Sequence, residues 1–215
     1  MHPLANYRVK LKSRDEIAAG TMAFHFDVRS FTLASAPFEE DLMIATRMRD
    51  TAFKRSLNSV PLGTELTLEA PWGELILHDD ARIPAVFLTG GIGITPVRSM
   101  VLQATHDHLP HKLTLFYANH RPEDAAFLDE LTAARTANPN LTLVATMSDM
   151  EKSAAQWDGE TGHVSKAMLT KYIVDLTSPI YYISGPPGMV AAMQKTLSGA
   201  GVKTSNIRAE EFSGY

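Results

Sequence analysis

Apolar and polar residues alternate with a period of two in several short segments of the first 80 residues, the pattern of half-buried strands. These segments are residues 7–11 (YRVKL), 22–26 (MAFHF) and 65–69 (ELTLE), and residues 31–35 and 42–48 fit two more strands. Pro and Gly punctuate the end of the region at Pro61, Gly63, Pro71 and Gly73. The pattern predicts an antiparallel, all-β first domain over residues 1–80.

After Arg82 the pattern changes to apolar runs separated by amphipathic segments. The predicted strands are residues 85–89, 112–118, 141–147, 180–184 and 206–212, with helices beginning at Pro96, at Pro122 and near Ser165, and a further helix over residues 187–198. Five apolar strands alternating with helices predict a parallel sheet covered by helices on both faces. We therefore expect a β domain followed by a five-stranded parallel α/β domain over residues 81–215.

Composition narrows the possible functions. The 215 residues are 45% hydrophobic and carry a formal net charge of −4, so no global basic field favours a nucleic-acid partner. The absence of cysteine excludes disulfides and thiolate metal sites within this chain. The first residues lack a long apolar run, and we therefore expect a cytoplasmic protein with no membrane partner.

Two glycine-containing loops join a predicted strand to a predicted helix. The first is residues 89–96 (TGGIGITP) and the second is residues 184–189 (SGPPGM). Glycine lets the backbone approach an anion closely, and a helix N-terminus supplies N–H donors, so each loop fits a dinucleotide pyrophosphate. A plain strand-to-helix turn is the alternative, because Pro96 occupies the third glycine position of a G-x-G-x-x-G motif. Both loops lie at the carboxyl edge of the sheet, where ligands bind in open α/β folds.

Four motifs occur in a fixed order: RSFT at 29–32, TGGIGITP at 89–96, SGPPGM at 184–189 and EFSGY at 211–215. In this order the chain resembles the ferredoxin–NADP reductase superfamily, especially the compact bacterial NAD(P)H-dependent flavin oxidoreductases. The resemblance implies a β-barrel that holds FAD, or FMN, and an α/β domain that brings NADPH or NADH to it. Electrons would then pass to a separate acceptor, either a small molecule, a ferredoxin or another redox protein.

The resemblance also implies a set of flavin-binding residues. Arg29 suits a flavin phosphate, Phe31 suits the isoalloxazine or ribityl region, and the Thr32 hydroxyl suits the N5 edge. Further along, the matching positions for phosphate-binding backbone amides are Thr51, Ala52 and Phe53, with Ser56 assisting. For residues 29–32 the alternative is an ordinary strand, and for the segment that contains Thr51 and Ser56 it is a run of charged side chains exposed to solvent.

For the nicotinamide nucleotide, the matching positions lie on the two glycine loops: Gly91, Gly93, Ile94, Thr95 and Pro96 on one, and Gly185, Pro186 and Met189 on the other. Ser184 stands where many relatives have a catalytic cysteine near the nicotinamide. Arg121 follows the second strand of the α/β domain and could receive the 2′-phosphate of NADPH, which favours NADPH over NADH; a solvated Arg121 is the alternative. In the C-terminal segment 211–215, the resemblance implies that Phe212 covers the flavin and that Glu211 assists proton movement. The alternative is that both residues serve only the fold.

Two further features qualify this interpretation. Three histidines, His106, His108 and His111, occur close together without a carboxylate cluster, and we expect exposed side chains and no metal site. The second predicted strand runs straight into Arg29, so the barrel is expected to lack one strand and its loop. A shortened barrel would bind flavin loosely, which leaves a nucleotide-binding regulatory module without flavin as the alternative function.

Overall fold

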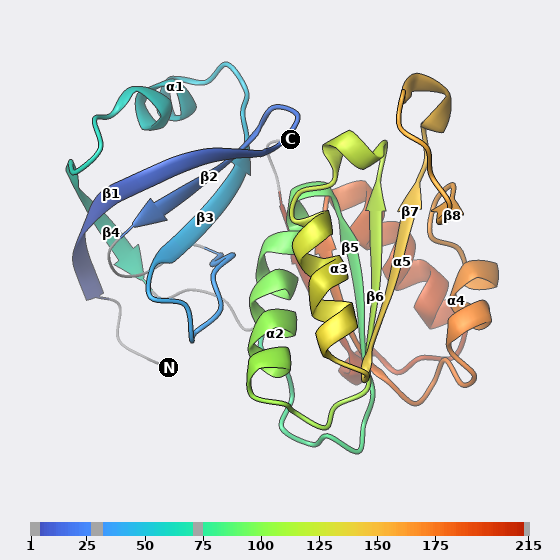
Figure 1. The fold of residues 1–215 in the computed structure, drawn as a ribbon. Helices are drawn as coiled ribbons and strands as arrows, with labels where there is room; N and C mark the ends of the chain where they lie inside the picture. Colours follow the sequence, from blue (N-terminus) through green and yellow to red (C-terminus); the bar gives the residue numbers. More distant parts are fainter. Residues whose placement is uncertain (1–4, 27–31, 71–74, 213–215) are drawn as a thin grey trace.

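The computed structural model describes residues 5–26, 32–70 and 75–212, which form two sheets lying side by side (Figure 1). The first sheet belongs to the N-terminal half, residues 5–70, and the second to the C-terminal half, residues 75–212. The predicted boundary near residue 80 lies between the last strand of the first sheet and the first strand of the second. The division into two domains at that residue stays a prediction.

The N-terminal half is a four-stranded antiparallel sheet with one helix. Its strands are β1 (Ala5–Ala18), β2 (Thr21–Phe26), β3 (Leu42–Arg47) and β4 (Glu65–Ala70), in the order β3-β2-β1-β4, and its helix is α1 (Ala52–Ser59). A small core of Leu11, Phe24, Ile44 and Leu57 packs α1 against the sheet. The predicted antiparallel β architecture is confirmed, and β1 is longer than its alternating segment predicts.

The strand predicted over residues 31–35 is wrong for its described part, because residues 32–35 form a loop. The amides of Ala34 and Ser35 both donate to the carbonyl oxygen of Met43, and the Ser35 hydroxyl accepts from the Met43 amide at 3.0 Å. A serine side chain therefore takes a backbone partner that a regular strand would have used.

The C-terminal half is a parallel sheet in the order β10-β9-β5-β6-β7-β8. Its strands are β5 (Ala85–Gly90), β6 (Leu113–Asn119), β7 (Leu141–Met147), β8 (Glu160–Thr161), β9 (Ile180–Gly185) and β10 (Ile207–Glu211). The predicted parallel α/β sheet is confirmed, although β8 adds a sixth, two-residue strand at its edge.

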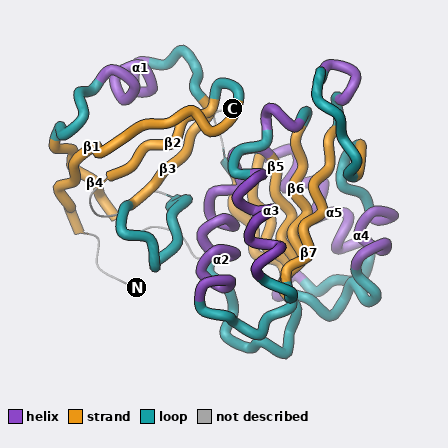
Figure 2. The backbone as a smooth tube through the Cα atoms, viewed as in Figure 1, coloured by secondary structure: helices purple, strands orange, loops and turns teal. Residues whose placement is uncertain are grey.

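Helices cover both faces of this sheet, as Figure 2 shows. The helices are α2 (Ile94–His106), α3 (Leu128–Ala137), α4 (Lys166–Tyr172) and α5 (Pro187–Gly199). Residues that alternate along β5 enter different cores: Phe87 packs with residues of α2 and α3, and Leu88 packs with residues of α4 and α5. A strand buried on both faces explains why β5 is an uninterrupted apolar run.

The helix predicted from Pro122 begins later. Residues Pro122–Asp124 form a 3-10 turn, and α3 starts only at Leu128. Between them Phe127 has a φ of +61°, in the left-handed region that interrupts a right-handed helix. Within the described residues, no helix combines the length and the apolar character needed to cross a bilayer.

Candidate nucleotide-binding site

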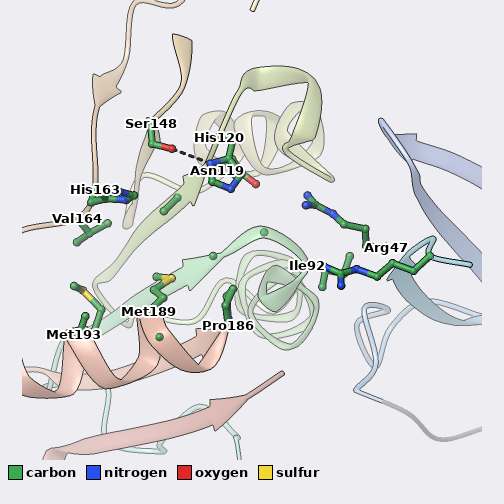
Figure 3. A pocket seen from close by; sticks show the side chains of 16 residues that line it. Arg47, Ile92, Asn119, His120, Ser148, His163, Val164, Pro186, Met189 and Met193 are labelled. Atoms are coloured by element: carbon green, nitrogen blue, oxygen red, sulfur yellow. Dashed lines mark hydrogen bonds between the residues drawn. The ribbon is translucent and has the colours of Figure 1, made fainter. Parts of the chain in front are cut away.

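A cavity of about 590 Å³ opens at the carboxyl ends of the parallel strands (Figure 3). Its wall combines the end of β5, the ends of β6 and β7, the start of α5 and two arginines from the N-terminal half. The lining residues are Arg47, Arg49, Gly90, Gly91, Ile92, Ala118, Asn119, His120, Ser148, His163, Val164, Pro186, Gly188, Met189, Ala192 and Met193. Both halves of the chain therefore contribute to one site.

The two glycine loops are in direct contact, as their common sheet edge predicts. Ser184 is fully buried, and its hydroxyl donates to the carbonyl oxygen of Gly93 at 2.7 Å. A β-carbon on Gly93 would lie 2.4 Å from the carbonyl oxygen of Ser184 and 2.6 Å from the α-carbon of Gly185. Gly93 thus permits close packing of two loops, whereas Gly91 lines the cavity and has a φ of +53°, in the left-handed region that favours glycine.

The three residues that follow Gly93 are buried beneath the loop. Ile94, Thr95 and Pro96 form the first turn of α2, and the Thr95 hydroxyl donates to the carbonyl oxygen of Ile92 at 3.2 Å. None of these three residues is in the cavity wall. Of the predicted nucleotide-binding residues, the structure brings Gly91, Pro186 and Met189 to the cavity; Gly93 and Gly185 lie behind it.

One wall of the cavity is apolar. It includes Val164, Met189 and Met193, and the Met189 sulfur lies so close to Gly90 that a β-carbon there would be 2.4 Å from it. Methionine side chains adapt to flat, irregular ligand surfaces. This wall therefore suits the aromatic ring of a nucleotide.

The opposite wall is polar, and its residues are not among those predicted from the sequence. Both polar atoms of the Asn119 amide are buried without a hydrogen-bond partner among the described residues. Next to it, His120 Nδ1 lies 3.0 Å from the Ser148 hydroxyl (Figure 3). Because both amide atoms of Asn119 are buried, the polar groups of this wall that can meet a bound ligand are the His120 ring and the Ser148 hydroxyl.

Arg121, by contrast, lies outside the cavity wall. Its guanidinium makes two hydrogen bonds, both of 2.9 Å, to the Asp124 carboxylate. The hydrogen bonds from Arg121 hold the pKa of Asp124 below its usual value. The structure thus engages Arg121 in a local ion pair.

The positive side chains in the cavity wall come from the N-terminal half. Arg47 ends β3 and Arg49 follows it, and Figure 3 shows Arg47 extending toward Ile92. These two residues were not predicted from the sequence, and they lie just before the predicted phosphate-binding positions Thr51, Ala52 and Phe53. Guanidinium groups and glycine amides together form a donor set suited to phosphate.

The predicted flavin-binding residues are dispersed. Arg29 and Phe31 lie outside the described residues. Thr51 caps α1, where its hydroxyl accepts from the Lys54 amide at 3.3 Å, and it is exposed together with Ala52, Phe53 and Ser56. None of these four residues lines the cavity.

The tail lies beside the second glycine loop. Strand β10 runs parallel to β9, and the Phe212 amide donates to the carbonyl oxygen of Gly185 at 2.9 Å. Thr32 is half-buried, and its hydroxyl donates to the Glu210 carboxylate at 3.3 Å, whereas the predicted Glu211 is exposed. Glu210 is therefore the tail carboxylate that contacts the predicted flavin segment.

The histidines are not arranged as a metal site. Within the described residues, no group of three His, Asp or Glu side chains could hold a metal ion. His106 and His108 are exposed, and His106 stacks on Phe38. The expectation of exposure is wrong for His111, which is buried because its Nε2 donates to the carbonyl oxygen of His78 at 2.8 Å.

The parallel sheet, the glycine loops and the phosphate-type donor set are those of a nucleotide-binding domain. A model of the family "Oxidoreductase NAD-binding domain" matches residues 87–195, and the chain belongs to this family. The resemblance to the ferredoxin–NADP reductase superfamily is thereby confirmed, as is the expectation of an oxidoreductase.

Solved structures agree with this fold at low sequence identity. The Amycolatopsis cytochrome P450 reductase GcoB superposes with a TM-score of 0.85 at 18% identity, over 99% of this chain and 71% of that one. A ferredoxin NADP+ reductase from Neisseria gonorrhoeae with bound FAD and NADP superposes with a TM-score of 0.75 at 17% identity, over 96% and 98%.

Among curated proteins, the chain is similar to one of the subunits of Na(+)-translocating NADH-quinone reductases. The protein from Actinobacillus succinogenes is 29% identical over 203 residues, which are 87% of this chain and 49% of that protein. The one from Mannheimia succiniciproducens is 27% identical with the same coverage. The chain thus spans about half the length of the curated relatives it matches.

Proposed function

We propose that this chain binds FAD and NADH and passes electrons from NADH to a separate acceptor. The observation that carries the proposal is the cavity in which the glycine loops of the C-terminal half face two arginines of the N-terminal half. The names of the relatives support it, since they are NADH-quinone reductase subunits, and one structural neighbour contains FAD.

The nucleotide would occupy the cavity with its phosphates between Arg47, Arg49 and the Gly90–Gly91 backbone. The Ser148 hydroxyl and the His120 ring in the cavity wall would hydrogen-bond the polar part of the adenosine, and Met189 would pack on a ring. In this arrangement the phosphates would be recognised by charge, and the ring would be recognised by the shape of the apolar wall.

The FAD site would use residues of the N-terminal half. The first-turn amides of Ala52 and Phe53 have no acceptor within α1, as at any helix N-terminus, and Arg29, Phe31 and Thr32 complete the set predicted from the sequence. Bound FAD would supply the redox chemistry, hydride acceptance from NADH and transfer of two electrons to the acceptor, with one proton taken up from solvent on reduction and two protons released on reoxidation.

NADH is favoured over NADPH by the charges around the adenosine end. Arg121 is paired with Asp124, while the Asp149 carboxylate follows Ser148 and lies 3.7 Å from His120 Nδ1. Lys152 donates to Asp149 and lowers its pKa, so Asp149 is ionised at neutral pH. Asp149 is not in the cavity wall, but it adjoins the wall residues His120 and Ser148, and a carboxylate at this rim would disfavour the 2′-phosphate of NADPH. This proposal reverses the preference expected from Arg121.

An absorption spectrum is the first test. Purified protein, or protein reconstituted with FAD, should show flavin absorbance that NADH bleaches under anaerobic conditions. A colourless protein that binds NADH but retains no added FAD would refute the proposal and favour the regulatory nucleotide-binding module.

Coenzyme preference is tested with two variants and the ratio of kcat/KM for NADH over NADPH. Asp149→Asn should lower this ratio about fivefold or more, because it removes a charge beside the 2′ position. Arg121→Gln is the matched control and should leave the ratio within about twofold. A larger change in the control than in Asp149→Asn would restore Arg121 as the specificity residue.

The acceptor is proposed as a separate redox partner, such as a quinone or another redox protein. The relatives are named as subunits of a sodium-translocating reductase, so the proposed acceptor includes a partner at a membrane, and the expectation of a cytoplasmic protein without a membrane partner is not part of the proposed function.

A further inference from the structure

Arg98 is a buried arginine that the cavity does not use. It lies on α2, one turn beyond the first glycine loop, and only 3% of its side chain is exposed. A buried guanidinium is costly unless each of its N–H groups has a partner. The identity of those partners therefore shows what the residue holds in place.

All five N–H groups of the Arg98 guanidinium have acceptors. Two hydrogen bonds, of 2.6 and 2.5 Å, go to the Glu130 carboxylate on α3, and two more, of 2.8 and 2.9 Å, go to the Glu39 carboxylate. The fifth goes to the carbonyl oxygen of Ala34. Burial alone would lower the pKa of Arg98, but the bonds to Glu39 and Glu130 raise it overall, so the side chain stays charged.

These partners belong to different halves of the chain. Glu130 lies on α3 of the C-terminal half, whereas Ala34 and Glu39 lie in the loop of residues 34–39 in the N-terminal half. The same loop has two more contacts with α2: the Phe38 amide donates to the Gln103 side chain at 3.0 Å, and the Phe38 ring stacks on His106. Arg98 is thus the buried member of a row of α2 side chains that holds the 34–39 loop.

The 34–39 loop directly follows the segment predicted to contact flavin. Ala34 is two residues after Thr32, and Arg98 is five residues after Gly93, so one guanidinium joins the backbone next to the flavin segment to the helix that starts at the nicotinamide loop. Hydride transfer is sensitive to such placement, because a displacement of about 1 Å can slow a reaction by about a hundredfold.

We propose that Arg98 is a positioning residue that fixes the 34–39 loop, and with it the neighbouring Thr32, relative to the first glycine loop, acting through Glu39 and Ala34. This inference rests on the proposed flavin and NADH function. Arg98 itself touches neither the cavity nor the reacting groups.

The structure offers a matched pair of variants. Glu39→Gln weakens the attachment of Arg98 to the N-terminal half, and Glu130→Gln weakens its attachment within the C-terminal half; both carboxylates are bidentate to the same guanidinium. Glu39 and Glu130 are partly exposed, at 26% and 39%, so both variants should fold. Arg98→Lys keeps the charge but loses the planar fork.

Anaerobic single-turnover reduction of the bound flavin by saturating NADH is the functional measurement. Glu39→Gln and Arg98→Lys should slow reduction about tenfold or more, with the flavin content and the Kd for NADH within about twofold of wild type. Glu130→Gln should reduce flavin within about threefold of the wild-type rate. Equal slowing by Glu39→Gln and Glu130→Gln, or no slowing by Glu39→Gln, would overturn the proposal.

Amide hydrogen exchange of flavin-free protein gives a readout that does not depend on activity. Residues 34–39 should exchange about tenfold faster in Arg98→Lys than in wild type or Glu130→Gln. Glu39→Gln does not enter this comparison, because Glu39 also accepts from the Ala36 amide within the loop at 2.5 Å. Unchanged exchange in that loop would refute the attachment. A wild-type protein that holds no flavin would refute the proposed function instead, and the exchange data would still decide whether Arg98 holds the loop.

Discussion

Replacing Gly93 by alanine should destabilise the fold rather than only weaken coenzyme binding. The added β-carbon would lie 2.4 Å from the Ser184 carbonyl oxygen and 2.6 Å from the Gly185 α-carbon, where ordinary contacts are about 3.5–4.0 Å. Both atoms are backbone atoms of β9, which is paired with β5 and with β10. The overlap of about 1 Å must therefore be relieved by moving a strand at the centre of the sheet.

The cost follows from two contributions. Overpacking of this kind costs about 1–3 kcal/mol, and distorting the 2.7 Å hydrogen bond from Ser184 to the Gly93 carbonyl oxygen adds about 1–2 kcal/mol. The sum of about 2–5 kcal/mol corresponds to a fall in Tm of roughly 5–20 °C for a chain of this length.

Thermal unfolding followed by far-UV circular dichroism measures this effect. Gly188→Ala is the control, because a β-carbon there meets nothing within 4 Å at the start of α5, and its Tm should change by only a few degrees. A Gly93→Ala variant within about 2 °C of wild type, with weakened NADH binding, would refute the packing argument and restore Gly93 as a ligand-binding glycine.

Three further perturbations test other parts of the structure. The free energy of unfolding should fall as the pH drops from about 7 to 5, because burial lowers the pKa of His78 below 6.5 and the unfolded chain therefore binds more protons. Denaturant unfolding across this pH range measures the fall. Tyr182→Phe should make the fall smaller, because the hydrogen bond from the Tyr182 hydroxyl to His78 Nδ1 favours the neutral ring. Ser184→Ala should cost about 0.5–1.5 kcal/mol in urea unfolding, because it removes a buried hydrogen bond to the Gly93 carbonyl oxygen, and an unchanged midpoint would contradict that bond. Arg29→Ala should lower flavin retention by about 1.5–3 kcal/mol, measured as the Kd for FAD, and unchanged retention would remove Arg29 from the phosphate site.

The parts of the site that the sequence predicted are local. A strand, a glycine turn and a helix start are consecutive in both glycine loops, so their residues alone place Gly91, Pro186 and Met189 at the carboxyl edge of the sheet. The alternation of strands and helices likewise predicted the parallel sheet, and only the two-residue β8 was too short to leave a pattern.

The parts that the sequence did not predict depend on contacts between distant segments. Arg47 reaches the cavity because of how the two sheets sit together, which no local pattern encodes. The late start of α3 follows from the positive φ of Phe127, whose ring lies 5.0 Å from the Arg98 guanidinium. The burial of His111 depends on the carbonyl oxygen of His78, 33 residues away.

The segment that enters β5 is bonded to other strands of the C-terminal half before β5 begins. The Ile76 carbonyl oxygen accepts from Arg208 at 2.6 Å, and the His78 amide donates to the Tyr182 hydroxyl at 2.8 Å, both toward the amino ends of the strands. The Arg98 contacts lie near the start of α2, toward the opposite edge of the sheet.

The Ala19 amide of the N-terminal half also donates to the carbonyl oxygen of Glu123 at 3.0 Å, so the halves are bonded both at Arg98 and at Glu123. Rotation of the N-terminal half against the C-terminal half would have to break at least one of these two attachments. Nucleotide exchange is therefore expected to depend on movement of side chains and loops at the cavity rim.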